Sequence, residues 1–241
     1  MTISRREVLG LGAAAVGATL LAPGLRLIEL ARARSPEEAA TSLKRWGLLI
    51  DASQCGDCDV CVTACHEENG VVGHGRPATD AQWIRKVTLK DKQTGYVQTL
   101  PLMCQHCEEP PCVDVCPTGA SFKRADGIVL VDKHICIGCR YCMMACPYKA
   151  RSFVHEDTTG QKPHAPRGKG TVESCTLCVH RVDAGKIPAC VEACNKDGGK
   201  AMLFGDLKDP ESEIAQRLAR APSTQIRPDL NLNTGVRYRN I

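Results

Sequence analysis

The chain has 241 residues, a formal net charge of +4 at pH 7 and only 4% aromatic residues. This length suits one domain or two small ones, and the weak net charge argues against a nucleic-acid-binding protein. With so few large side chains, a stable core is plausible if inorganic groups fill part of the interior.

The first 33 residues have the pattern of an export signal. Arg5 and Arg6 precede a Gly/Ala-rich apolar stretch that runs to about Leu25, and Ala31-Arg32-Ala33 fits an A-x-A cleavage site. Twin arginines before a weakly apolar stretch are typical of a Tat signal, so we expect residues 1–33 to send a folded protein to the periplasm. The alternatives are a chance arginine pair before an ordinary apolar helix, and a signal retained as a membrane anchor, because the stretch is near the length that spans a bilayer.

After the signal, short apolar runs alternate with cysteine-rich loops. Residues 34–45 predict a charged linker, and residues 46–205 predict one domain with surface-loop inserts at 66–103 and 155–174. Residues 206–241 predict a tail that docks on a partner or straps the domain, with one amphipathic helix at Glu211–Ala221. The runs that predict strands are Trp46–Ile50, Thr99–Met103, Gly127–Val131, Gly170–Glu173 and Ala201–Phe204.

The sixteen cysteines of the chain fall into four groups of four. The groups are Cys55, Cys58, Cys61 and Cys65; Cys104, Cys107, Cys112 and Cys116; Cys136, Cys139, Cys142 and Cys146; and Cys175, Cys178, Cys190 and Cys194. The third group, followed by Pro147, has the C-x2-C-x2-C-x3-C-P spacing of bacterial ferredoxins. A cubane cluster takes one thiolate for each iron, so the four groups predict four [4Fe–4S] clusters.

Three other uses of the cysteines are weaker. A disulfide framework does not require grouping in fours, and closely spaced triple cysteines would invite scrambled pairing. Structural zinc usually takes two Cys-x2-Cys pairs separated by a longer loop, which only the fourth group resembles. A [3Fe–4S] cluster would be expected where a group lacks a cysteine, and none does.

The spacing also predicts how the groups share clusters. The fourth cysteine of a ferredoxin run ligates the other cluster of a pair. Only 19 residues separate groups two and three, whereas 38 residues separate Cys65 from Cys104. We therefore expect groups two and three to share one pair and groups one and four the other; pairing one with two and three with four is the weaker alternative. The expected sets are site A (Cys55, Cys58, Cys61, Cys194), site B (Cys65, Cys175, Cys178, Cys190), site C (Cys104, Cys107, Cys112, Cys146) and site D (Cys116, Cys136, Cys139, Cys142).

Charged residues near the groups have two interpretations. Arg140, Lys149 and Arg151 lie near the third group and would raise the reduction potential there if they were buried, but we expect solvated surface charges. Asp57 and Asp59 lie in the first loop and should lower the potential nearby.

The histidines and the rest of the chain predict no catalysis. Since every group has its fourth cysteine, His106, His134 and His180 are expected as hydrogen-bond donors or surface residues rather than cluster ligands. We find no phosphate-binding loop and no nucleophile with a partner base. The predicted fold class is α+β: nested bacterial ferredoxin-like domains, with short strands and helices around four [4Fe–4S] clusters.

Residues 46–205 resemble a known family, the four-cluster ferredoxin-type electron-transfer subunits of membrane redox complexes. Stretches at 79–85, 103–107, 117–124, 139–150 and 168–175 are especially similar to the periplasmic iron–sulfur subunits of Dsr-type complexes in sulfur-metabolising prokaryotes. Two departures are His66 after Cys65 and Asn195 after Cys194, where the ferredoxin pattern has proline.

The resemblance implies a function and partners. It implies single-electron relay between a quinone-interacting integral membrane subunit of the NrfD type and a periplasmic multihaem cytochrome c, in dissimilatory sulfur metabolism and without nucleic acid. The protein would then be attached to the outer face of the cytoplasmic membrane through these partners or a retained signal anchor. The alternatives are the iron–sulfur subunit of a periplasmic molybdopterin oxidoreductase, a free ferredoxin shuttle, and a self-contained redox enzyme.

Overall fold

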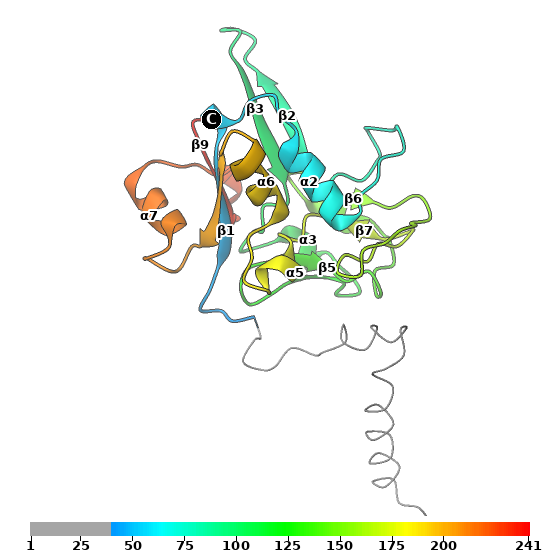
Figure 1. Ribbon diagram of the computed structural model, residues 1–241. Coiled ribbons are helices and arrows are strands. Elements are labelled where there is room, and N and C mark those ends of the chain that lie inside the picture. Colours follow the sequence, from blue (N-terminus) through cyan, green and yellow to red (C-terminus); the bar gives the residue numbers. More distant parts are fainter. Residues whose placement is uncertain (1–39) are drawn as a thin grey trace, which may run out of the picture. The chain divides into compact units, whose positions relative to one another are not determined.

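A computed structural model describes residues 40–241 as short helices and small sheets (Figure 1). The predicted Tat signal and the first part of the predicted linker, through residue 39, lie outside the described residues. The strands are β1 (Trp46–Asp51), β2 (Ile84–Lys90), β3 (Val97–Met103), β4 (Ser121–Lys123), β5 (Val129–Val131), β6 (Ser152–Phe153), β7 (Val172–Glu173), β8 (Met202–Asp206) and β9 (Val236–Arg239). The helices are α2 (Val60–Asn69), α3 (Pro111–Asp114), α4 (Tyr141–Ala145), α5 (Val179–Val182), α6 (Ala189–Asp197) and α7 (Glu213–Arg220), with 3-10 turns at Ala52–Gln54 and Pro228–Leu230. None of the described helices has the length and apolar character needed to cross a bilayer.

The central sheet joins the two ends of the described chain. Its order is β8-β1-β9, with β8 antiparallel and β9 parallel to β1. Leu48, Leu49 and Ile50 of β1 are buried, as the apolar run predicts for a strand covered on both faces. The sheet therefore holds the loop that follows β1 next to the helix that precedes β8.

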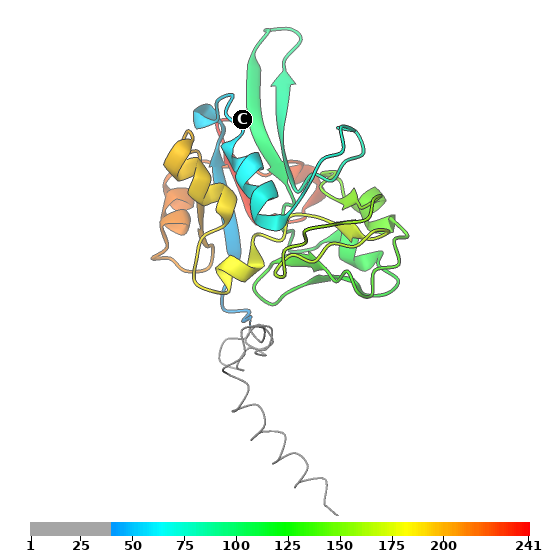
Figure 2. The same cartoon turned by 45° about the vertical axis from the view of Figure 1, so that its right-hand side comes forward.

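The helices that carry cysteines pack in pairs. Helices α2 and α6 lie side by side, as Figures 1 and 2 show, and carry cysteines of groups one and four. Helices α3 and α4 also contact each other and carry cysteines of groups two and three. Each pair brings together groups that are apart in sequence, within the mixed α and β architecture that the sequence predicts.

The first insert is more ordered than its composition predicts. Strands β2 and β3 form an antiparallel hairpin that extends away from the rest of the described chain (Figure 2), where a surface loop was expected up to Thr99. At its base Trp83, Ile84 and Leu100 are buried, whereas Tyr96 near its tip is exposed. The apolar base anchors the hairpin to the core, and this packing was missed because the polar tip dominates the composition of the insert.

The second insert contains a buried ion pair. The guanidinium of Arg167 donates to both carboxylate oxygens of Glu173, at 2.9 and 2.8 Å, and to the carbonyl oxygen of Gly70 at 2.8 Å. Both charged side chains are almost fully buried. Such a paired and fully hydrogen-bonded charge fixes the insert against α2 and β7, so this segment is also more than a surface loop.

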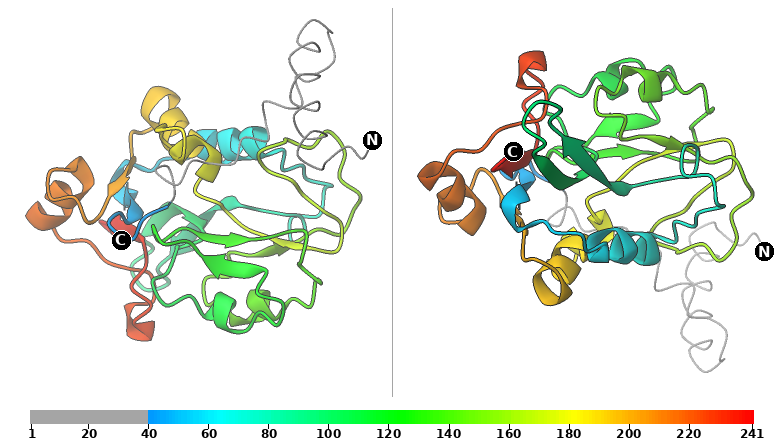
Figure 3. Two further views of the ribbon diagram at one scale, coloured as in Figure 1. Left: turned by 90° about the horizontal axis from the view of Figure 1, so that it is seen from below. Right: turned by 90° about the horizontal axis from the view of Figure 1, so that it is seen from above.

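The tail straps the domain through its last strand. Tyr238 of β9 is fully buried; its hydroxyl donates to the carbonyl oxygen of Pro101 at 3.0 Å and accepts from Gln105 Nε2 at 3.2 Å. Thr234, just before β9, forms a bridge with Cys107. The tail thus contacts the loop of the second cysteine group, and its last strand β9 lies beside β1, near the end marked C in Figure 3. Docking on a partner remains a prediction for the rest of the tail.

Because Tyr238 fills the contact between β9 and β3, Tyr238→Ala is expected to lower the free energy of unfolding by about 3–5 kcal/mol, the usual cost of truncating a buried aromatic side chain. Thermal unfolding of the iron-loaded protein under anaerobic conditions measures the effect. Tyr96→Ala, at the exposed tip of the hairpin, is the matched control and should unfold like the wild type. Equal stability of the two variants would contradict a strapping role for the tail.

Candidate iron–sulfur sites

All sixteen cysteines lie in the described part of the chain, and none of them forms a disulfide. The structure gathers them into small sets rather than distributing them over the surface. The sets are built from both members of each helix pair and from the loops that precede the helices.

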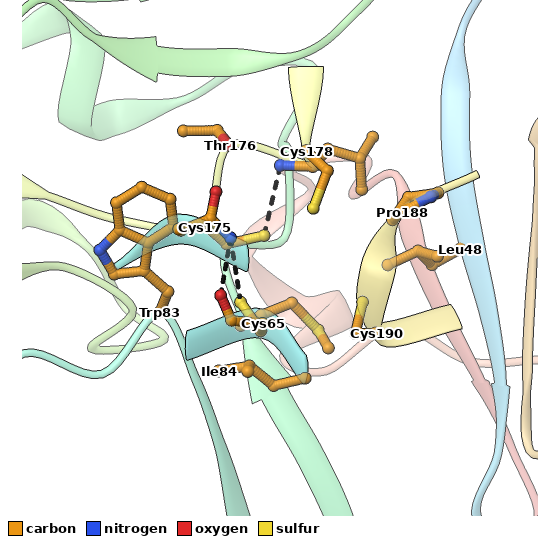
Figure 4. A pocket seen from close by; sticks show the side chains of 12 residues that line it. Leu48, Cys65, Trp83, Ile84, Cys175, Thr176, Cys178, Pro188 and Cys190 are labelled. Carbon is orange, nitrogen blue, oxygen red and sulfur yellow. Dashed lines mark hydrogen bonds between the residues drawn. The ribbon is translucent and has the colours of Figure 1, made fainter. Parts of the chain in front are cut away.

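Site B is a closed cavity between α2, α6 and the loop after β7. Cys65, Cys175, Cys178 and Cys190 line it together with apolar residues that include Leu48 and Trp83 (Figure 4). All four cysteines are buried. The backbone N–H of Leu177 donates to Cys175 Sγ at 3.3 Å, and Asn69 Nδ2 lies 3.7 Å from Cys65 Sγ. The cavity thus combines four sulfurs with N–H donors that stabilise negative sulfur.

Site C is a second cavity that four cysteines line. Cys104, Cys107, Cys112 and Cys146 line it, and all four are buried. Pro110, Tyr148 and Arg151 complete its wall. The first three cysteines come from the loop before α3 and from α3 itself, and the fourth directly follows α4, as the nested pairing requires.

Site A lies where the loop after β1 meets α6. Burial raises the pKa of the Cys61 thiol to about 12, reinforced by Cys194, Cys55 and Cys58, which places these four sulfurs in one electrostatic neighbourhood. Cys58 is exposed. The ammonium group of Lys86, on β2, donates to the carbonyl oxygens of Gly56 and Cys58 and so holds the loop in place.

Site D is the other set that reaches the surface. Cys142 interacts electrostatically with Cys136 and Cys116, and Cys139 lies exposed in the same loop. The N–H groups of Ser121 and Val172 donate to Cys116 Sγ at 3.3 Å and to Cys136 Sγ at 3.4 Å. The loop can turn so tightly because position 138 is glycine: its φ is +70°, and a Cβ there would lie 2.1 Å from the carbonyl oxygen of Gly170.

Electrostatic contacts between sets give the sites an order. Cys190 of site B interacts with Cys61 of site A. Cys175 of site B interacts with Cys104 of site C, and Cys112 of site C interacts with Cys142 of site D. The order is therefore A, B, C, D, with both inner sites buried and both outer sites partly exposed. The sets coincide with those expected from the nested pairing; their ligation of clusters stays a prediction.

The protonation chemistry of the thiols tests whether iron–sulfur clusters fit these sites. Burial raises the pKa of Cys104 to about 12, and the neighbouring cysteines Cys112 and Cys146 add to the effect. Burial also raises the pKa of Cys65 and Cys175 far above that of a free thiol. Four thiolates so close together in an apolar cavity need positive charge among them. Iron in a [4Fe–4S] cluster supplies that charge and takes one thiolate for each metal, so the residues present fit this group.

The expectation for the charged residues of the third group is wrong at one position. Arg140 and Lys149 are exposed, as expected, and the Arg140 guanidinium lies 4.3 Å from the centre of the Phe153 ring. Arg151 is instead only 5% exposed and lines site C. Arg151 directly precedes β6, and its burial depends on how the chain folds at this point, which the spacing of the cysteines does not reveal.

The three histidines flanking the groups occupy different environments. His106 is buried, and its Nδ1 accepts the N–H of Val129 at 3.0 Å. Burial, with the nearby Arg151 charge, lowers the pKa of His106 to about 3, so this ring is neutral. His134 is exposed. His180 Nε2 lies 2.7 Å from Glu68 Oε1, in a polar contact rather than at a cluster.

His180 belongs to the one group of side chains outside the four sites that could hold a metal ion, within residues 40–241. It consists of Glu68, His164 and His180. The Glu68 carboxylate already pairs with Arg181 Nη1 at 3.1 Å, and the two imidazole rings stack with their centres 3.8 Å apart. Arg181 also pairs with Glu192, so the group belongs to a wider set of ion pairs, in which Glu68 and His180 form a polar contact between α2 and α5.

Two functional contacts were missed in the sequence. Asn69, whose Nδ2 reaches Cys65, stands four residues after that cysteine, a spacing that places both on one face of a helix and could have been recognised. Lys86 supports the first cysteine loop from the hairpin, 30 residues after Gly56, and no local signal indicates that contact.

Comparison with known proteins gives two matches to the 4Fe-4S dicluster domain, over residues 54–120 and 95–207. The chain is 42% identical to Hdr-like menaquinol oxidoreductase iron-sulfur subunit 1 of Archaeoglobus fulgidus, over 98% of this chain and 97% of the relative. It is 42% identical to a tetrathionate reductase subunit of Salmonella typhimurium, over 83% of this chain and 74% of the relative. It is 41% identical to protein NrfC of Escherichia coli K12, over 74% and 73% of the two chains.

The order of the sites gives a test of the pairing by iron content. Cys55→Ala and Cys194→Ala should each remove site A, so the double variant should lose no more iron than either single variant, about four atoms per chain. Combining Cys55→Ala with Cys65→Ala should instead remove sites A and B and about eight iron atoms. Iron and sulfide analysis of the purified proteins measures both. Additive losses for Cys55 and Cys194 would contradict a shared site.

Proposed function

The chain belongs to the family of 4Fe-4S dicluster iron–sulfur subunits, and on that premise we propose that it relays single electrons within a membrane-bound, quinol-linked oxidoreductase complex. The observation that carries the proposal is that neighbouring sites interact in the order A, B, C, D, with the two middle sites buried and the two outer sites partly exposed. Such a row of interacting sites suits transfer between two partners. Four bound [4Fe–4S] clusters would supply the one-electron redox chemistry.

The residues of the chain itself hold, shield and stabilise the sites. Apolar side chains such as Leu48 and Trp83 exclude water from site B, and Tyr148 closes site C. Backbone N–H groups at Leu177, Ser121 and Val172 donate to cysteine sulfurs. Such donors and such exclusion of solvent are the means by which a protein sets the potential of an iron–sulfur site.

The two exposed ends of the row differ in chemistry. Around site D, large apolar side chains are exposed, among them Ile137 at 66% and Met144 at 67%. Around site A, the exposed loop carries the acidic residues Asp57 and Asp59. An exposed apolar patch indicates an interface, whereas an acidic patch suits a partner with a basic surface. We assign the site D end to an integral membrane subunit and the site A end to a soluble partner.

The finer proposal is a subunit of the DsrO type in dissimilatory sulfur metabolism. The membrane partner would then be a quinone-interacting subunit of the NrfD type, DsrP-like, and the soluble partner a DsrJ-like periplasmic multihaem cytochrome c. The proposal rests on the sequence resemblance at 79–85, 103–107, 117–124, 139–150 and 168–175. The Tat-type N-terminus supports a periplasmic location at the outer face of the cytoplasmic membrane, attached through partners or a retained anchor.

A second candidate is the iron–sulfur subunit of a molybdopterin oxidoreductase. The similarity to the tetrathionate reductase subunit over 83% of the chain favours this branch. The row of sites serves either function equally, because both need electrons to pass between a membrane subunit and a soluble one. A free ferredoxin shuttle is less consistent with the exposed apolar side chains around site D.

Purification of the tagged protein from detergent-solubilised native membranes separates these functions. We expect recovery with a polytopic NrfD-type subunit and a multihaem cytochrome, at about sixteen non-haem iron atoms per chain. Mass spectrometry with iron and haem analysis of the same sample gives the composition. A molybdopterin subunit in place of the cytochrome would assign the chain to the reductase branch, and a protein found alone in the soluble fraction would refute the membrane complex.

The apolar patch around site D gives a second prediction. The double variant Ile137→Glu, Met144→Glu should lose at least about tenfold of the recovered membrane subunit, because charged side chains at an apolar interface must be desolvated. Its iron content should stay at the wild-type level. The matched control is Leu89→Glu, Tyr96→Glu, which changes exposed apolar residues of the hairpin. Equal recovery in the two double variants would contradict the assignment of the site D end.

A further inference from the structure

Arg151 is a buried cation without an ordinary partner. Its side chain lies on the wall of site C, next to β6, and the residue is 5% exposed. Within residues 40–241 no oxygen atom accepts a hydrogen bond from Nη1 or Nη2, and the groups that meet the guanidinium are the sulfurs of Cys112 and Cys142. A buried charge is strongly unfavourable unless a group of opposite charge compensates it.

The groups around Arg151 are cysteine sulfurs from two sites. Burial acts to lower the pKa of Arg151, but Cys112 and Cys104 of site C and Cys142 of site D outweigh it, and the net shift is upward. The remaining charged or titratable neighbours are His106, which is neutral, and Lys133, which has the same sign of charge. Among residues 40–241, the sulfurs of sites C and D are therefore the anionic groups that can compensate the guanidinium.

We propose that Arg151 is a positioning charge shared by sites C and D, which raises the reduction potential of the centres they hold relative to those of sites A and B. The inference rests on the proposed function, since it requires that the sites bind [4Fe–4S] clusters. Reduction adds an electron to a centre, and a fixed positive charge in a medium of low dielectric constant stabilises the reduced form. Arg151 would thus favour electrons on the half of the row that ends at the apolar patch.

The cations near the other sites are placed differently. Lys86 near site A donates to backbone carbonyl oxygens. Arg140 is exposed beside site D and lies over the Phe153 ring. Water screens an exposed charge strongly, so only Arg151 combines full charge, burial and contact with two sites within the described chain.

The test is a redox titration of the iron-loaded protein followed by electron paramagnetic resonance, from which a midpoint potential is fitted for each of the four centres. Arg151→Met should lower two of the four midpoint potentials. The expected change in the ratio of reduced to oxidised centre at fixed potential is about tenfold, which equals about 59 mV for one electron. The other two potentials should change by less than about a third of that amount. Arg151→Lys, which keeps the charge, should lie close to the wild type.

Arg140→Met is the matched control, because it removes the same charge from an exposed position beside site D. Its four potentials should stay close to those of the wild type. Arg151→Gln removes the charge but keeps a polar side chain with N–H donors, so it replaces the Met variant if that protein loses iron. The identity of the shifted centres follows from Cys55→Ala combined with Cys65→Ala, which should remove the signals of sites A and B and leave both shifted signals present.

Each outcome decides the inference. Unchanged potentials in an iron-loaded Met or Gln variant would overturn it, and so would an equal shift of all four centres or a shift in Arg140→Met of the same size. Loss of iron from both charge-removing variants would also overturn the tuning role and would assign Arg151 to cluster retention. Failure of the proposed function itself looks different: the wild-type protein would lack about sixteen iron atoms per chain before any titration began.

Discussion

The fold depends on the burial of thiol groups that must carry negative charge. Most of the sixteen cysteines are part of the hydrophobic core, where aliphatic and aromatic side chains would stand in an ordinary domain. Burial raises the pKa of thiols such as Cys65 and Cys175, so without metal these sites favour protonated sulfur and would be loosely packed. A metal centre both supplies the missing positive charge and fills the space, which explains how a chain with 4% aromatic residues can have a stable interior.

The small sheets and helices bury the cysteine thiols and hold them in place. In the central sheet of β8, β1 and β9, strand β1 contributes Leu48 to the wall of site B, and the sheet fixes the loop of site A beside α6. The hairpin adds Trp83 to the wall of site B and Lys86 to the loop of site A. The central sheet and the hairpin are therefore parts of the walls that separate the sites from water, although neither carries a cysteine of the four groups.

Much of this organisation could be predicted from the sequence, because cysteine spacing is a local signal with a specific chemical meaning. The spacing of the four cysteine groups predicted which sulfurs the fold brings together. Short apolar runs predicted the positions of β1, β3, β5, β7 and β8. The hairpin base, the Arg167–Glu173 pair and the burial of Arg151 could not be predicted, since each depends on residues brought together by the fold. The expectation that Arg151 is exposed was wrong for this reason, because the position of a residue beside a motif in the sequence does not reveal whether its side chain is buried.

The parallel pairing of β9 with β1 has a consequence for biosynthesis. Translation runs from the first strand to the last, so the central sheet can close only after residue 239 has left the ribosome. The cysteines of sites C and D are complete once residue 146 has emerged, whereas sites A and B must wait for Cys190 and Cys194. Maturation would then proceed from the inner part of the sequence outward, and the final strand would act as a latch that distinguishes a finished molecule from a nascent one.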